Sequence, residues 1–230
     1  MAKAFGVSAV FGEPVCNHVY AQLMGRTINT ISRALEVDLL PAEAYKKEQS
    51  SSGRVAALVN FATVIPRPHR VYLPDPYVEA LTFCYTELDD QRDLDLADQP
   101  IPAGMPTVIT PQIFDFAKMA RLAVWEAGPD FGPQLAADEA ACVEKGAAVI
   151  QLWLKMTWPW LGEVVSIANQ RGYFLGGALL RWFDDDGLLL QKILHRPNFE
   201  GVVLQFDRAK KIMDMVRSDW SRVQPQAAGQ

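Results

Sequence analysis

The chain has 230 residues, of which 50% are hydrophobic and 21% charged, and its formal net charge at pH 7 is −5. This composition excludes disorder for the bulk of the chain, because disordered chains combine low hydrophobicity with high net charge. The negative charge argues against a protein whose main task is to neutralise phosphates, so we expect no nucleic-acid partner. The length fits one large domain or two small ones.

Membrane and export signals are not visible in the sequence. No apolar run reaches the roughly 18 residues that a membrane-spanning helix needs, and the run 149–154 is interrupted by Gln151. The first five residues hold no long apolar segment of the secretory kind. We therefore expect a cytoplasmic protein without membrane contact.

The cysteines and histidines are scattered in a way that predicts no metal site. Cys16, Cys84 and Cys142 form no C-x-x-C pair, and the three histidines form no H-x-x-x-H pair. Five aspartates fall within residues 89–98, but they lack the register and the final glutamate of a calcium loop. We expect an acidic loop there, three reduced thiols and no bound metal.

The first 65 residues predict the order strand, helix, strand, strand. The expected elements are a buried strand over 6–15, a helix over 18–24, a strand with one wet face over 30–40 and a strand over 54–65. Asn17 favours the helix start and Gly25 its end. The polar run 46–53 predicts a flexible loop that joins the last two strands as a hairpin.

The prolines within 66–76 mark the best boundary in the chain. The pattern beyond them predicts a helix after Pro76, strands over 107–116 and 118–127, a helix over 134–145, a strand over 147–157, a helix over 160–171, strands over 174–183 and 188–194, and a helix over 207–223. Asp186-Gly187 indicates a hairpin turn, and residues 224–230 predict a flexible tail. Alternating helices and strands with hairpins predict an α/β or α+β fold, a mixed sheet flanked by helices.

An internal echo leads to a family resemblance. The order strand, short helix ending in glycine, two paired strands occurs at 6–65 and again at 147–194. The second part resembles the GNAT acyltransferase superfamily, whose core order is strand–loop–helix–strand–helix–strand. The run Ala168–Tyr173 is similar to the end of that family's fourth helix, and 172–191 looks like GNAT-like domains of multidomain bacterial proteins. Residues 6–25 are similar to the last part of a preceding GNAT domain.

The resemblance implies two units and an activity. Residues 1–65 would be a partial GNAT-like unit, 66–223 a fuller GNAT-like domain, and 224–230 the tail. The implied activity is transfer of an acyl group from acyl-CoA to an amine acceptor. The implied cofactor loop lies within 124–135, where the binding residues would be Gly128, Phe131, Gly132 and Gln134.

The cofactor loop departs from the family's pattern. Such a loop holds a pyrophosphate through backbone N–H groups at a helix N-terminus. Here Pro129 and Pro133 remove two donors, Asp130 adds negative charge, and no basic residue is present. An ordinary strand-to-helix turn is therefore the competing interpretation. If acyl-CoA does bind, we expect an affinity no better than roughly tens of micromolar.

Four residues are the main candidates for the chemistry, each with an ordinary alternative, and a fifth is weaker. Glu126, at the end of a strand, is a candidate general base or a solvated turn carboxylate. Glu13 and His18 could face one cleft as an acid–base pair, or they could be surface and capping residues. Tyr173 matches the aromatic of the family's Gly-aromatic pair, a position that usually serves packing. Tyr20 is a weaker candidate acid.

Aromatic side chains are dense in the second part, where they favour a core or an interface and could also line a ligand pocket. They are Trp153, Trp158, Trp160, Tyr173, Phe174, Trp182 and Phe183. Two functions remain open: an acyl-CoA-dependent transferase with a divergent cofactor loop, and a non-catalytic GNAT-like module that binds a small ligand or a partner. The partial unit has no room for a phosphate loop before its first strand, so it would complete its sheet with another chain or domain. We expect a homodimer; packing of the two units on each other is the alternative.

Overall fold

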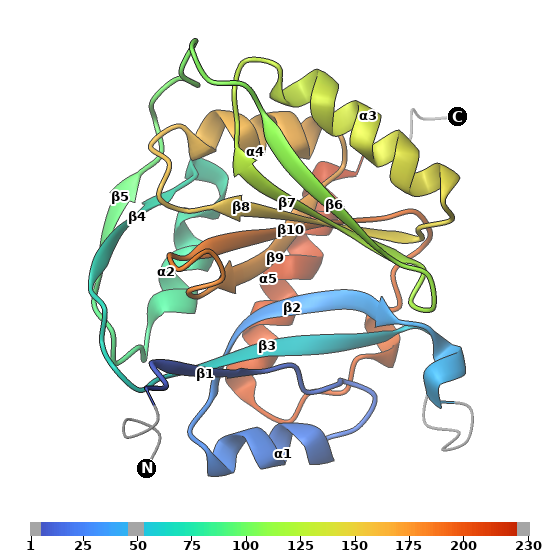
Figure 1. Cartoon of the computed structure of the whole chain (residues 1–230). Coiled ribbons are helices and arrows are strands. Elements are labelled where there is room, and N and C mark those ends of the chain that lie inside the picture. Colours follow the sequence, from blue (N-terminus) through green and yellow to red (C-terminus); the bar gives the residue numbers. More distant parts are fainter. Residues whose placement is uncertain (1–5, 46–52, 225–230) are drawn as a thin grey trace.

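A computed structural model describes residues 6–45 and 53–224 and confirms the expected class, a mixed α+β fold in which helices flank one large sheet (Figure 1). The predicted loop at 46–53 and the predicted tail at 224–230 fall almost wholly outside the described residues. All three cysteines are buried free thiols.

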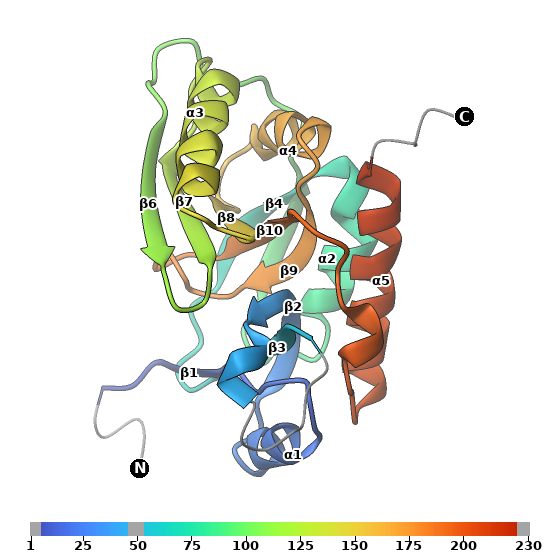
Figure 2. The same cartoon turned by 90° about the vertical axis from the view of Figure 1, so that its right-hand side faces the viewer.

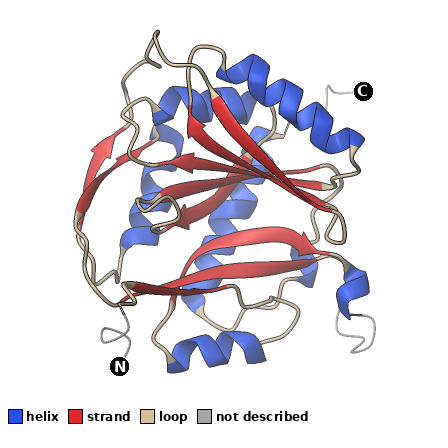
Figure 3. Ribbon diagram, in the orientation of Figure 1, coloured by secondary structure: helices blue, strands red, loops and turns tan. Residues whose placement is uncertain are grey.

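Ten strands and five helices follow one another along the described chain, and Figure 3 separates them by colour. The strands are β1 (Ala9–Gly12), β2 (Ile31–Leu40), β3 (Val55–Thr63), β4 (His69–Leu73), β5 (Arg92–Leu96), β6 (Val108–Phe114), β7 (Met119–Glu126), β8 (Val149–Lys155), β9 (Phe174–Leu179) and β10 (Gly187–Ile193). The helices are α1 (Tyr20–Thr27), α2 (Val78–Tyr85), α3 (Phe131–Glu144), α4 (Leu161–Gln170) and α5 (Asp207–Val223).

The large sheet has the order β1-β3-β2-β9-β10-β8-β7-β6, and all its neighbours are antiparallel except β7 and β8. The echo seen in the sequence has a structural counterpart. In each case a strand and a helix precede a hairpin, and the first strand pairs with the last: β1-β3-β2 on one side and β8-β10-β9 on the other. The adjacent strands β2 and β9, where the two echoes meet in the sheet, therefore come from equivalent places in the two echoes.

The junction between β2 and β9 is narrow. Its only backbone pair within the described strands is Ala34 with Gly177, and a Cβ on Gly177, at φ +131°, would lie 2.5 Å from Arg33 O. Only glycine allows this approach. Beyond it the Gln191 side chain fills the gap: its Nε2 donates to Leu35 O (3.0 Å) and its Oε1 accepts from the N–H of Val37 (2.9 Å).

Helices α2 and α5 cover one face of the sheet, the side opposite β6 in Figure 2. The face of α5 that carries Ala209, Ile212 and Val216 is buried against β2, β3 and β9, at the three- and four-residue spacing of a helix. Burying each large aliphatic side chain contributes about 1.5–3 kcal/mol, so this contact fixes the helix on the sheet.

Several boundaries differ from the sequence prediction. The first strand is not a buried 6–15 strand but the short β1 at the edge of the sheet, where Phe11 is exposed. Gly25 lies within α1 rather than at its end, and Asn29 takes the left-handed φ of 56° two residues after the helix. Part of the acidic stretch 89–98 forms β5, which pairs in parallel with β4.

The wet face predicted for β2 is wrong. Ser32 to Leu39 are all buried, because β2 lies mid-sheet between α5 and the β6–β7 hairpin. Two carboxylates are therefore inside the protein. Asp38 accepts hydrogen bonds from His195 Nε2 (2.8 Å) and from the N–H of Asn198. The other, Glu36, belongs to the candidate site.

A buried ion network ties the N-terminal hairpin to the rest of the molecule. Arg92 donates Nε to Asp186 Oδ2 (2.7 Å) and lies 3.0 Å from Asp90, while Arg181 pairs with Asp90 and donates to Ile65 O (2.7 Å). Burial alone would raise the pKa of Asp186, but hydrogen bonds from His69 and Arg92 lower it to about 2. Asp186 therefore stays ionised throughout the physiological range.

Candidate functional site

The loop between β7 and α3 is where the resemblance implies an acyl-CoA pyrophosphate. The helix begins at Phe131, three residues before the predicted start at 134. The segment before β6 is packed against this loop: a Cβ on Gly128 would lie 1.7 Å from Met105 O. Thr107 binds the loop twice, since its N–H donates to Asp130 Oδ1 (2.9 Å) and its Oγ1 accepts from the N–H of Gly128 (3.0 Å).

The residues of this loop do not fit a pyrophosphate. Three of the four predicted cofactor residues already use their backbone N–H groups. The N–H of Gly128 donates to Thr107 Oγ1, that of Phe131 to Gly128 O (3.0 Å) and that of Gln134 to Asp130 O (3.0 Å). Among the described contacts, only the N–H of Gly132 is left for a phosphate. The prolines supply none. Hydrogen bonds from Thr107 lower the pKa of Asp130, which keeps a negative charge where a phosphate would need donors.

The strands on either side of this loop separate at their carboxyl ends. β7 and β8 pair in parallel from Met119–Ala123 to Val149–Trp153, and pairing stops before either strand ends. On its other side β7 has a register shift at Trp125, which lies between residues paired with β6. Bulges and diverging parallel strands are frequent next to binding sites, because they leave main-chain groups without a sheet partner.

Glu126 lies at this end of β7, as predicted, beside a lysine and an aromatic pair. Lys155 Nζ is 3.8 Å from Glu126 Oε1 and 5.5 Å from the ring centre of Trp125. Trp125 in turn meets Phe183 edge to face, with ring centres 5.3 Å apart. The carboxylate is thus part of a half-exposed surface group, and its role as a base stays a prediction.

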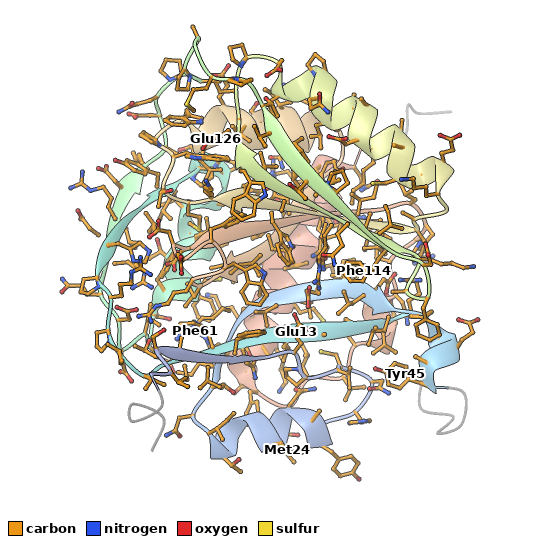
Figure 4. All side chains as sticks on the ribbon, in the orientation of Figure 1. Glu13, Met24, Tyr45, Phe61, Phe114 and Glu126 are labelled. Atoms are coloured by element: carbon orange, nitrogen blue, oxygen red, sulfur yellow. The ribbon has the colours of Figure 1, made fainter. Side chains whose placement is uncertain are left out.

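Glu13 lies far from Glu126, which is near the top of the molecule (Figure 4). Glu13 is exposed just after β1, on the lower part of the sheet. No hydrogen bond or ion pair joins Glu13 to His18 among the described contacts, and the His18 ring instead lies 5.5 Å from that of the exposed Tyr20. The catalytic role predicted for this pair therefore gains no geometric support.

Tyr173 is fully buried, and burial raises its pKa well above 10. Its hydroxyl has no hydrogen-bond partner within the described part of the chain. These surroundings fit the packing role that was the alternative for Tyr173. Because no atom of the side chain is exposed, the catalytic role predicted for Tyr173 gains no support.

Sequence analysis missed Glu36, which is buried on β2. Its Oε1 accepts from Gln151 Nε2 (2.7 Å) and lies 3.8 Å from Arg121 Nη2, while Oε2 has no hydrogen-bond partner among the described residues. Burial, and then the nearby carboxylate of Glu13, raise its pKa to about 7. A carboxyl group that changes protonation near neutral pH is a candidate acid or base. The available signal was a glutamate between two apolar residues, Leu35 and Val37, of a predicted strand.

The aromatic cluster expected from the sequence divides between two places. Trp158, Tyr173 and Phe174 are buried in the core. Trp153 and Trp182 are half-buried on the face that carries Glu36, with ring centres 5.7 Å apart. On the same face Phe11 meets Trp182 (4.8 Å), and Arg121 lies over Trp153 (4.7 Å). This face combines aromatic rings, a guanidinium and a carboxyl group that titrates.

A scan of the chain against protein-family models finds no match, and searches of curated proteins and of solved structures find no similar protein. The GNAT resemblance therefore stays a prediction. Among the described residues, no cluster of three or more His, Cys, Asp or Glu side chains could hold a metal ion. Within residues 6–45 and 53–224, no helix has both the length and the apolar character that a membrane crossing needs.

Proposed function

We propose that this chain is a GNAT-like ligand-binding module without the acyl-CoA site of that superfamily. The order β7, loop, α3, β8, α4, β9 is the strand–loop–helix–strand–helix–strand order of the resemblance. It supports the family at the level of topology alone, and topology does not determine function.

One observation carries the proposal: the chain's own segment before β6 binds the loop that would hold the cofactor. Met105 approaches Gly128 so closely that no side chain fits between them, and Thr107 uses both the Gly128 N–H and the Asp130 carboxylate. A pyrophosphate at this loop would have to displace these contacts and approach an ionised carboxylate. We therefore infer that this loop does not bind acyl-CoA.

The test is calorimetric titration of the full chain with CoA and with acetyl-CoA. We expect no saturable binding below about 1 mM, which corresponds to about −4 kcal/mol. The double variant Thr107→Val with Asp130→Asn serves as a comparison, because it removes the contacts and the charge that oppose a phosphate. Saturable binding of CoA to the unchanged chain at tens of micromolar or tighter would overturn the proposal.

An acyl-CoA-dependent N-acyltransferase is the second candidate. It is favoured by the divergence of β7 and β8 after Ala123 and Trp153, which frees main-chain groups at the carboxyl ends of two parallel strands. Glu36, with its pKa of about 7, would be the candidate base on the adjoining face.

Thiol release from acetyl-CoA in the presence of a panel of amines tests this candidate. If the chain is a transferase, Glu36→Gln lowers kcat by about 10²–10⁴-fold, the usual contribution of a general base. The exposed Glu144→Gln is the matched control and leaves the rate unchanged. Absence of amine-dependent thiol release with every amine would remove this candidate.

A further inference from the structure

β1 forms one edge of the large sheet, and its pairing with β3 extends beyond the strand in an unbroken register. Ser8 O accepts from the N–H of Val64 (3.0 Å), and Pro14 O accepts from the N–H of Leu58 (3.0 Å). Along an antiparallel strand, every second residue exchanges hydrogen bonds with its neighbour. The even-numbered residues from 8 to 14 therefore direct their main-chain groups toward β3, and the odd-numbered residues direct theirs away from the sheet.

The outward main-chain groups belong to Ala9, Phe11 and Glu13. Among the described contacts, none of their N–H or C=O groups has a hydrogen-bond partner. The opposite edge of the sheet is protected, because β6 carries Pro111, and a proline on an edge strand prevents another strand from pairing there. Residues 9–13 hold no proline and no lysine. β1 is therefore an open edge that can accept a further strand.

Apolar side chains gather around this edge on both faces of the sheet. Phe11 is 59% exposed on the face that carries Trp182, whose ring it meets. On the other face, Ile28, which follows α1 and is 58% exposed, lines the same pocket as Val10. In Figures 1 and 2, β1 and α1 lie together in the lower part of the molecule, and α1 exposes Met24. Exposed apolar surface around an unpaired edge indicates an interface.

The edge is complementary to itself. When a strand pairs antiparallel with its own copy about a two-fold axis, each outward N–H meets an outward carbonyl of the same edge, so both copies use one surface. An axis at Phe11 places the two Phe11 rings beside each other and sets Ala9 opposite Glu13. Aromatic cross-strand pairs are stabilising, and like charges directly opposite are destabilising. This register therefore joins the rings and holds the two Glu13 carboxylates about 13 Å apart along the strands, since each residue rises about 3.3 Å.

We propose that β1 pairs with β1 of a second copy in this register, so that the two eight-stranded sheets join and the homodimer expected from the sequence has a defined interface. A ladder of three residues per copy is a small contact, and stable interfaces usually bury about 800 Å² per partner. The exposed Phe11, Ile28 and Met24 flank the edge and supply further apolar area. In Figure 4, Glu13 at this edge lies far from Glu126 beside the β7–α3 loop, so the dimer and the proposed function are tested separately.

The test is light scattering and sedimentation of the full chain across the micromolar range. We expect the mass to rise with concentration from the 25.6 kDa of one chain to twice that value. Phe11→Lys removes the aromatic pair and places two ammonium groups opposite each other, so it weakens the dimer by about tenfold or more. Phe116→Lys is the matched control, because Phe116 is an exposed phenylalanine (72%) outside this edge, and it leaves the dimer unchanged. Melting curves establish that both variants fold.

Cysteine cross-linking tests the register. The three native cysteines are buried, so a maleimide reaches only an introduced thiol. A short bismaleimide is expected to join two Phe11→Cys chains, because directly opposite residues of paired strands have Cβ atoms about 4.5–5.5 Å apart. Glu13→Cys is the matched control and is expected not to cross-link, because its two thiols lie about 13 Å apart along the strands.

A constant mass of 25.6 kDa, or a dimer as tight in Phe11→Lys as in Phe116→Lys, would overturn the inference. Cross-linking of Glu13→Cys as efficient as that of Phe11→Cys would overturn the register. If Phe11→Lys fails to fold, the cross-linking pattern decides, because only pairing about Phe11 joins the Phe11→Cys chains and leaves the Glu13→Cys chains separate. The strength of CoA binding bears on the proposed function alone.

Discussion

Replacement of Glu36 by glutamine should stabilise the protein at alkaline pH and not at acid pH. The folded-state pKa of Glu36 is about 7, above its ordinary value of 4.5, because the carboxyl is buried. Folding therefore favours the protonated form, and stability is lost as pH rises from about 4.5 through 7. The difference of about 2.5 pKa units corresponds to about 3 kcal/mol once the group is fully ionised.

Glutamine keeps the shape of the side chain and an acceptor for Gln151 Nε2, but it has no charge to desolvate. Urea unfolding at pH 4.5, 6 and 8 should show Glu36→Gln about 3 kcal/mol more stable than the parent at pH 8 and within about 0.5 kcal/mol at pH 4.5. The exposed Glu144→Gln should change stability by less than about 0.5 kcal/mol at all three values. A loss of stability in Glu36→Gln at pH 8 would refute the reasoning, because the carboxylate would then be stabilised by Arg121.

Three further predictions follow from other parts of the fold. Asp186→Asn should cost about 3–5 kcal/mol in urea unfolding because Arg92 and Arg181 then share the carboxylate of Asp90 and one buried charge is uncompensated, whereas the exposed Asp184→Asn should change little. Gly128→Ala should detach the segment before β6, seen as faster proteolysis there, while Gly104→Ala, which has open space around it, should not. Light scattering should give about twice the chain mass of 25.6 kDa, because α1 exposes apolar side chains and β1 is an unprotected edge; a constant 25.6 kDa would contradict the dimer.

The elements that could be predicted from the sequence are those with strong local signals. The helix 207–223 was predicted with the bounds it has in the structure, because its apolar face repeats at helical spacing. Gly146 and Gly172 directly follow the helices predicted over 134–145 and 160–171, and both have positive φ (83° and 85°), as helix-ending glycines usually do. The hairpin of β2 and β3 was likewise expected, since two β-rich runs flank a polar loop.

The errors arise where distant parts of the chain decide the outcome. β5 lies in an acidic stretch whose two leucines, Leu94 and Leu96, are both exposed, and it exists because β4 offers a parallel partner. The alternation of residues in β2 correctly predicted a strand, but it wrongly predicted that one face is exposed to water. The β6–β7 hairpin covers that face, and such a long-range contact cannot be read from the local pattern. Glu36 was missed as a candidate site residue for this reason. The loop at 128–133 was predicted to be a poor phosphate site, but its contacts with Met105 and Thr107 lie outside any local pattern.

The two candidate functions make opposite demands on the carboxyl end of β7. In Figure 4, Glu126 marks that end near the top of the molecule. A transferase would have to hold the acyl group of acyl-CoA within about 3–3.5 Å of the acceptor amine, because reacting atoms must come that close. A binding module needs no CoA, and the contacts of Met105 and Thr107 with the β7–α3 loop can stay in place. Absence of both CoA binding and thiol release would therefore support the binding module, whereas amine-dependent thiol release would support the transferase even where CoA binding is weak. The titration and the thiol assay together separate a binding protein from an enzyme.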